Sequence, residues 1–166
     1  MRLTVHTDYA LRLLMYLALK KDGLATIAEI AVTYDISRNH LTKVAHELGV
    51  AGYVVTVRGR GGGLRLAQPV EAIILGEVVR KTEPGMAALV PCLKLDDTSC
   101  ALFPACVLRR AMTVASAAFL QALDGYTLGD LIEPGGKLRA LLTISQSDRD
   151  VASRSNRVAR REPPEY

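Results

Sequence analysis

The stretch that decides the fold is "TIAEIAVTYDISRNHLTKVAHELGVAGYVVTVRGRGGGLRLA", residues 26–67. It opens with Thr26 and Glu29 at the spacing of a capping box, which predicts the start of a helix. After the short link "DIS", Ser37 can cap a further helix, and Gly49 offers a left-handed position at which that helix ends. The stretch therefore predicts two short helices in close succession.

The helix predicted after Ser37 has one apolar side and one polar side. Its buried side comprises Leu41, Val44, Ala45 and Leu48, and its outer side comprises Arg38, Asn39, Thr42, Lys43 and His46. Arginine can fork onto guanine and asparagine can pair with adenine, whereas threonine and lysine can hold phosphates. A solvated helix surface would carry the same residue types. If the helix reads DNA, the residues predicted to contact the groove are Ser37, Arg38, Asn39, His40, Thr42 and Lys43.

The residues that follow predict a β-hairpin. Val55 and Val57 alternate with polar neighbours, as do Leu64 and Leu66, and a glycine-rich turn that needs positive backbone angles joins the two strands. With a helix predicted over residues 8–20 and capped by Thr7, three short helices precede the hairpin. This order predicts a mostly α fold with a small β-hairpin wing, a winged helix–turn–helix. The hairpin adds three predicted DNA contacts, Arg58, Arg60 and Arg65, of which Arg60 can approach a narrow minor groove or a phosphate.

Charge and hydropathy restrict the function further. Residues 1–68 carry nine Lys and Arg against five Asp and Glu, whereas residues 69–144 carry seven against eight, so the positive excess lies where a polyanion would bind. The apolar run at residues 11–19 contains Arg12 and lacks a signal-peptide cleavage pattern. No segment reaches the roughly 20 apolar residues of a membrane span. We therefore expect a cytoplasmic protein that binds double-stranded DNA and no membrane.

The second half of the sequence predicts a homodimer. A helix over residues 76–81 precedes the breaker "EPG", and a long helix is predicted over residues 107–124. That helix carries an a/d-type seam, which can pack on the chain's own core or pair two chains, and we expect it to pair two chains: Leu108, Met112, Ala115, Phe119 and Ala122. "YTLGDLI" adds a last helical turn. The predicted divisions are DNA binding over 1–82, a cluster-binding loop over 83–106, dimerisation and a C-terminal helical segment over 107–144, and a disordered tail over 145–166.

All three cysteines lie in "PCLKLDDTSCALFPAC", residues 91–106. Seven residues separate Cys92 from Cys100, and five separate Cys100 from Cys106. In a compartment where thiols stay reduced, this odd set indicates metal or redox chemistry rather than disulfides. Structural zinc sites and iron–sulfur clusters both prefer four ligands, so three thiolates need a donor from elsewhere. The spacing alone leaves open an iron–sulfur cluster, a zinc ion and a thiol redox switch.

Other function classes lack support in the sequence. The glycine run at residues 61–63 is followed by a strand-like segment rather than by Gly-Lys-Ser/Thr and a helix, which argues against a nucleotide-binding loop. The three histidines, His6, His40 and His46, have no partner motif for hydrolysis, and no Cys-x-x-Cys, flavin or nicotinamide motif supports a redox enzyme. We therefore expect a protein that is not an enzyme. The rival from another class is a module stabilised by zinc or thiols.

Several segments in combination carry a family resemblance: "MRLTVHTDYALRLLMYLA", "YDISRNHLTKVAHELG", "TVRGRGGGLRLA", the cysteine loop closing on "PAC", and "YTLGDLI". Over roughly residues 1–142 the chain resembles the iron–sulfur winged-helix regulators that include NsrR, IscR and RirA, and most of all the nitric-oxide-sensing NsrR type. The resemblance implies a homodimeric repressor that releases a palindromic operator when nitric oxide nitrosylates its cluster. It implies a 4Fe–4S cluster, with 2Fe–2S as the alternative.

The resemblance also implies a set of metal ligands, namely Cys92, Cys100 and Cys106 from one chain and Asp8, in the "TDY" segment, from the partner chain. Asp8 equally suits the first turn of a helix, paired with Arg12 at i+4. For the fourth ligand, the residues alone leave open several other donors: Asp96, Asp97, Glu83 and His40. The seven-residue gap between the first two cysteines resembles the iron-responsive RirA type. A regulator that responds to iron or cluster status is therefore the alternative function.

Overall fold

The computed structural model describes residues 3–20, 23–83, 85, 93, 100–142 and 144 of the chain. Cys92 and the predicted tail lie outside these residues. The described part is mainly helical and contains an antiparallel hairpin, as predicted. Its elements are α1 (Val5–Leu19), α2 (Ile27–Tyr34), α3 (Arg38–Val50), β1 (Val54–Val57), β2 (Gly63–Leu66), η1 (Val70–Ala72), α4 (Leu75–Thr82), η3 (Phe103–Ala105), α5 (Val107–Asp124), α6 (Leu128–Leu131) and α7 (Gly135–Leu142).

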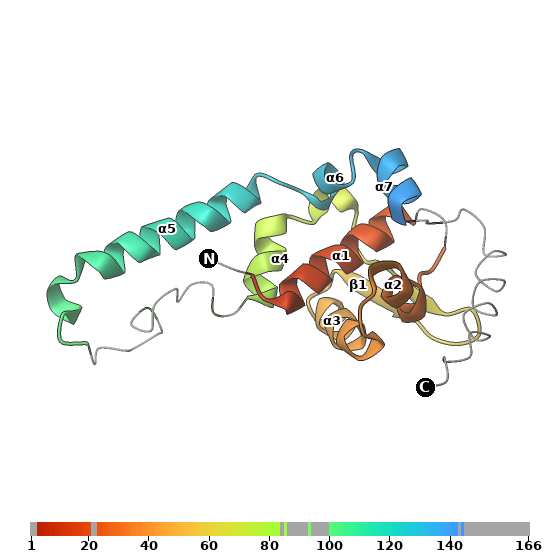
Figure 1. Cartoon of the computed structure of the whole chain (residues 1–166), viewed down its shortest axis with the longest axis horizontal. Coiled ribbons are helices and arrows are strands. Elements are labelled where there is room, and N and C mark those ends of the chain that lie inside the picture. Colours follow the sequence, from red (N-terminus) through yellow and green to blue (C-terminus); the bar gives the residue numbers. More distant parts are fainter. Residues whose placement is uncertain are drawn as a thin grey trace, which may run out of the picture.

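Helix α1 runs through the centre of the molecule and packs against α3, α4, α6 and β2 (Figure 1). The cap predicted at Thr7 is wrong, because the helix begins at Val5 and the side chain of Thr4 accepts the backbone N–H of Thr7 at 3.3 Å. Thr7 itself is fully buried, and its hydroxyl donates to the hydroxyl of Thr82 on α4 at 2.9 Å. Thr7 therefore joins two helices instead of starting one.

The capping box predicted for α2 is confirmed. The side chain of Thr26 accepts the backbone N–H of Glu29, and the Glu29 carboxylate accepts the backbone N–H of Thr26 at 2.7 Å. The same carboxylate meets Lys20 at 2.6 Å in a largely buried ion pair. Burial would raise the pKa of Glu29, but the hydrogen bonds from Lys20 and Thr26 lower it below its ordinary value. This pair fastens the end of α1 to the start of α2.

Helix α3 packs on α1 and α2 through the predicted face, since Leu41, Val44, Ala45 and Leu48 are all buried. It ends within one residue of the predicted end, but the left-handed position assigned to Gly49 is wrong. The helix continues to Val50, and Gly52, with φ +81°, takes the left-handed position that was predicted for Gly49. Both glycines follow the apolar stripe closely, and the pattern alone does not choose between them.

The hairpin is confirmed, and the side of β1 that faces the core is the one that carries Val54. Val54 is buried and pairs across from Leu66, whereas Val57 is 39% exposed. Because side chains alternate along a strand, Val54 and Leu64 share the core side and Val55 and Val57 face outward. The turn takes positive φ at two glycines, Gly59 (+104°) and Gly61 (+78°), as its composition predicts.

Helix α5 begins and ends where the sequence predicts, and it extends away from the rest of the described chain (Figure 1). Its last turns contact α4, where Leu120 packs on Val79. Of the predicted seam, Leu108 is 57% exposed, Ala115 and Ala122 are exposed, and Met112 and Phe119 are partly buried. Among the described residues, the intrachain alternative for the seam is realised only toward the end of the helix, where it meets α4.

After α5 the chain returns to the core. The predicted turn at "YTLGDLI" is α6, which starts with a capping box between Thr127 and Asp130. Leu128 of this helix is almost fully buried in the core around α1. Helix α7 is held to the end of α1 by Arg139, whose Nε donates to the carbonyl of Leu19 at 3.0 Å.

Candidate nucleic-acid interface and metal ligands

The polar side of α3 faces solvent. The predicted contact residues are all exposed: Ser37, Arg38, Asn39, His40, Thr42 and Lys43. Ser37 occupies the N-cap position, but its side chain makes no capping hydrogen bond. The hydroxyl of Thr42 donates to the carbonyl of Arg38 at 2.8 Å, so it is engaged with its own helix. Arg38, Asn39 and Lys43 are exposed along the same side of the helix.

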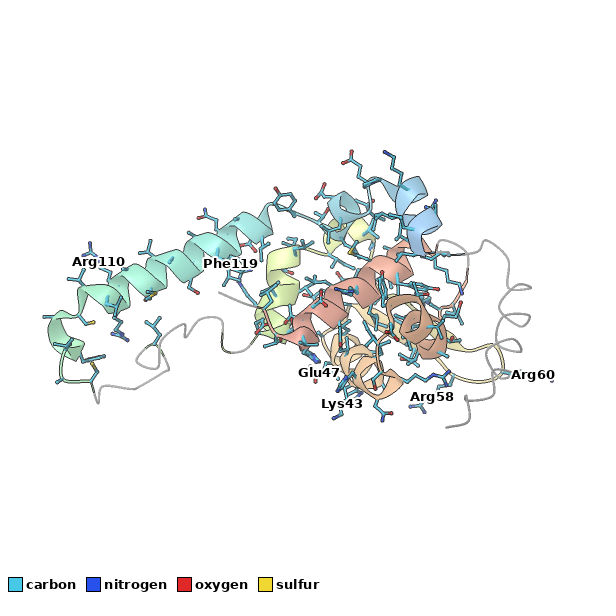
Figure 2. The ribbon with its side chains drawn as sticks, viewed as in Figure 1. Lys43, Glu47, Arg58, Arg60, Arg110 and Phe119 are labelled. Atoms are coloured by element: carbon cyan, nitrogen blue, oxygen red, sulfur yellow. The ribbon has the colours of Figure 1, made fainter. Side chains whose placement is uncertain are left out.

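The hairpin extends this surface with cationic side chains. Arg58, Arg60 and Arg65 are exposed, and Arg65 also donates to the neighbouring carbonyl of Leu66 at 3.2 Å. Figure 2 shows Lys43, Arg58 and Arg60 along one edge of the molecule, with Arg60 at the outer end of the hairpin. A row of cations on a helix and a projecting hairpin matches the charge that a DNA backbone requires.

The N-terminal half of α1 supports α3 through two polar or aromatic contacts. The ring of Tyr9 lies 6.1 Å from the ring of His40. His6 Nε2 lies 2.7 Å from Glu47 Oε2, though without the alignment of a good hydrogen bond. Glu47 is an exposed acid on the helix that was predicted to read DNA, and no sequence pattern assigns it a role. No local pattern reveals these contacts, because the partners come from different helices.

Two of the three cysteines lie in the described chain. Cys100 is exposed and Cys106 is partly buried, and η3 separates them. Cys106 is the N-cap of α5, where its Sγ accepts the backbone N–H of Arg109 at 3.4 Å. The guanidinium of Arg109 lies 4.7 Å from the centre of the Phe103 ring, on the turn between the two thiols. Two accessible thiols in an ordered turn are donors that suit iron–sulfur clusters and zinc.

Asp8 lies on the first part of α1, and its carboxylate meets Arg12 at 2.9 Å while about half exposed. Within the described chain no three His, Cys, Asp or Glu side chains gather closely enough to hold a metal, so Asp8 does not join Cys100 and Cys106. Figure 1 agrees, because the start of α5, which Cys106 caps, lies at the far end of the molecule from α1. One chain alone therefore does not assemble the predicted ligands.

Of the other donors left open by the sequence, Glu83 is accounted for by the fold. It is 8% exposed, and its Oε1 accepts the backbone N–H of Thr4 at 2.5 Å. Burial would raise the pKa of Glu83, but the hydrogen bonds from Thr4 and Thr7 and the nearby His6 lower it below its ordinary value. Asp96 and Asp97 lie outside the described residues, and His40 packs against Tyr9. Glu83 is thus a structural carboxylate that fastens the end of α4 to the start of α1.

Comparisons with known proteins agree with this architecture. Residues 3–134 match the Rrf2 family, described as an iron-dependent transcriptional regulator. The HTH-type transcriptional regulator NsrR of Shouchella clausii is 48% identical over 89% of this chain and 99% of its own length. The regulator of the same name from Bacillus subtilis is 46% identical over 88% of this chain and 100% of its own length.

Solved structures give the same result for the fold. CymR, the global cysteine regulator of B. subtilis, has a TM-score of 0.64 at 26% identity, covering 80% of this chain and 97% of its own. IscR of T. potens has a TM-score of 0.63 at 24% identity, covering 81% of this chain and 88% of its own, which is a likeness of fold. Among the described residues, no helix is both long and apolar enough to span a bilayer. With a family match over most of its length, the chain belongs to the Rrf2 family and is a winged-helix transcriptional regulator.

Proposed function

We propose that this protein is a homodimeric repressor that binds a palindromic operator in the cytoplasm and releases it in response to nitric oxide. The similarity to regulators named NsrR along nearly their whole length supports this reading. The signal would reach the protein through an iron–sulfur cluster, for which 4Fe–4S is the proposed type. Residues 1–82 would bind DNA, residues 83–106 would hold the cluster, and residues 107–144 would pair the two chains.

Four residues are proposed as ligands: Cys92, Cys100 and Cys106 from one chain and Asp8 from its partner. The observation that carries this proposal is the separation of Asp8 from the cysteine turn within one chain. Exposed apolar residues on α5 supply a surface on which a second chain can bring its α1 close. When bound, the cluster supplies iron that reacts with nitric oxide. Arg12, which lies 2.9 Å from Asp8 on the same helix, would pair with the carboxylate whenever no metal holds it.

The DNA contacts divide by chemistry. We assign base reading to Arg38 and Asn39 in the first turn of α3, because bidentate side chains at that position match base edges in the major groove. Ser37, His40, Thr42 and Lys43 would hold the adjacent backbone, and Arg58, Arg60 and Arg65 would hold phosphates or the minor groove beside the hairpin. Exposure of the whole set on α3 and the hairpin supports these assignments.

The direct test is an anaerobic titration of the purified protein with nitric oxide, in which visible absorbance and operator binding are followed in the same samples. We expect loss of the cluster absorbance and loss of the shifted duplex to proceed together. An iron chelator without nitric oxide tests the alternative, a regulator of iron or cluster status, which the wide cysteine gap favours. Colourless protein that contains zinc instead of iron and sulfide would refute the proposal.

The cross-chain ligand has its own test, a mixed dimer. One chain carries Asp8→Ala with intact cysteines, and the other carries Cys106→Ser with an intact Asp8. If Asp8 acts across the dimer, the mixed dimer has one complete site and retains about half of the wild-type iron and sulfide, although neither parent homodimer has any complete site. Exposed Glu71→Gln serves as the control for a lost negative charge. A mixed dimer with no more iron than its parents would rule out the cross-chain arrangement.

A further inference from the structure

The last turns of helix α5 pack on α4, and this contact joins α5 to the rest of the described chain. The backbone N–H of Leu75 donates to the carbonyl of Tyr126 at 2.9 Å, and the N–H of Leu128 donates to the carbonyl of Ile73 at 2.8 Å. These bonds fix the position of the chain just after α5 ends. The direction in which the helix leaves the rest of the chain depends, in addition, on how its last turns pack on α4.

Side chains one turn away supply the second point of attachment. Arg80 of α4 donates from both terminal nitrogens to Asp124 at the end of α5, at 2.6 and 2.7 Å. Gly76 makes this fork possible, because a Cβ on Gly76 would lie 1.9 Å from the Asp124 Oδ1 atom. Val79 and Leu120 pack together beside it. The apolar contact is non-directional, whereas a planar fork of two hydrogen bonds restricts orientation.

A small change of this angle is amplified along α5. The helix has 18 residues, so it is about 27 Å long, and a rotation of about 7° at its base moves its far end by about 3.4 Å. That displacement equals the rise of about one base pair. Figure 2 shows the geometry, with Phe119 near the body and Arg110 far out along the helix. In the described chain no other element packs along the first half of α5 to oppose such a rotation.

We propose that the Arg80–Asp124 fork, which packs against Gly76, limits the angle between α5 and the rest of the chain. This angular stop determines which spacing of DNA half-sites the dimer accepts. This inference rests on the proposed function, in which α5 pairs two chains and α3 reads DNA. The two reading helices then stand at a separation that is determined by the angle between each body and its α5. Because both side chains of the fork are substantially exposed, at 44% and 36%, its loss changes an angle without exposing a core.

The test compares four anaerobically purified proteins, wild type, Gly76→Ala, Asp124→Asn and Glu77→Gln. Gly76→Ala displaces the Asp124 side chain while keeping every charge, and alanine also favours a helix over glycine. Asp124→Asn removes the charged acceptor without changing its shape. Exposed Glu77→Gln removes a unit of negative charge beside Arg80 while leaving both hydrogen bonds of the fork in place. Each protein selects duplexes from a random library, and sequencing gives the distribution of half-site spacings.

We expect wild type and Glu77→Gln to select one spacing, and the two fork variants to accept neighbouring spacings as well. On synthetic duplexes, the preference for the best spacing over one shifted by a base pair should fall about fivefold or more in both variants, the loss typical of one mismatched base pair. Circular dichroism and sedimentation should show folded dimers throughout, and Gly76→Ala should unfold no earlier than wild type.

The outcomes separate this inference from the function on which it rests. A wild-type protein that selects no paired half-sites would refute the proposed function itself. A wild type that selects one spacing, with fork variants that select the same spacing equally sharply, would overturn the angular stop alone. Variants that unfold or dissociate into monomers would also overturn it, because the fork would then hold the fold together rather than set an angle.

Discussion

Replacing Glu83 tests how the segment before the cysteine turn is fastened to the helix that carries Asp8. The Glu83 side chain is 8% exposed and accepts the backbone N–H of Thr4. Glu83→Ala leaves that N–H without its acceptor. Loss of a hydrogen bond to a charged group costs about 1.5–3 kcal/mol, which lowers Tm by about 3–12 °C for a chain of this size. Glu83→Gln keeps an acceptor oxygen and should lose less than half as much.

The pH dependence has a definite sign. The folded-state pKa of Glu83 lies below its ordinary value of 4.5, because hydrogen bonds to the carboxylate outweigh the effect of burial. Its contribution to stability is therefore complete above about pH 4.5 and is lost as the pH falls through the folded-state pKa. The difference in Tm between wild type and Glu83→Gln should shrink as the pH is lowered from 7 toward 3.

Thermal unfolding followed by circular dichroism on metal-free protein measures both effects, since it does not depend on the cluster. Exposed Glu77→Gln, which ends no helix and accepts no described backbone bond, is the control and should change Tm by less than about 2 °C. The reasoning is refuted if Glu83→Ala unfolds at the wild-type temperature at pH 7. It is equally refuted if the gap between wild type and Glu83→Gln widens at low pH.

Four further substitutions probe the core, the DNA surface and the dimer. Leu48→Ala removes a side chain that is 1% exposed and should destabilise the protein by about 2–5 kcal/mol in denaturant titrations. Arg60→Ala should lower the binding affinity equally for DNA of any sequence and reduce the salt slope of binding by about 1. Asn39→Ala should instead relax the base preference by about 1–3 kcal/mol at one position. Equal losses of affinity on specific and random duplexes for both variants would contradict the assigned roles. Leu108→Asp places a charge in the exposed seam and should give monomers in sedimentation, unless α5 does not pair two chains.

Local signals in the sequence were sufficient for the start of α2 and for both ends of α5. The capping box of Thr26 and Glu29 involves residues three positions apart, and the long helix over residues 107–124 has no breaker before Gly125. In both cases the residues that determine the boundary are near neighbours in the chain. Tertiary contacts had nothing to override, and the predicted bounds of α5 are those observed.

The sequence was ambiguous where two residues close together in the chain were equally suitable for one structural role. Thr4 and Thr7 can each cap a helix, and packing against Thr82 decides that Thr7 lies inside it. The strand "VVTV" is apolar at three of its four positions, so alternation alone does not choose its core side. The pairing with β2 makes that choice, because Val54 must share a side with Leu64.

The site was predictable in its chemistry but not in its assembly. The three clustered thiols and the exposed cations of α3 are visible in the chain itself. By contrast, Glu83 and Thr4 are 79 positions apart, and Arg80 and Asp124 are 44 apart. No periodicity or motif joins such pairs, since only the packing of α4 between α1 and α5 brings them together. For this reason Glu83, which the sequence left open as a metal ligand, instead accepts a hydrogen bond that joins α4 to α1.

The proposed cluster ligands and the contact between α4 and α5 would both constrain the orientation of α3 relative to α5. Cys106 caps the start of α5 in one chain, whereas the proposed fourth ligand, Asp8, lies on α1 of the partner chain, which packs on that chain's α3. A shared cluster would therefore attach each body to the far end of the other chain's α5, while its own α5 attaches it through Arg80 and Asp124. The cluster and the α4–α5 contact together would fix the orientation of α3, whereas the α4–α5 contact alone would constrain it less. The stiffness of the joint then determines how far DNA affinity falls when the cross-chain attachment is lost, so a variant with a loosened fork should lose more affinity on cluster removal than wild type does.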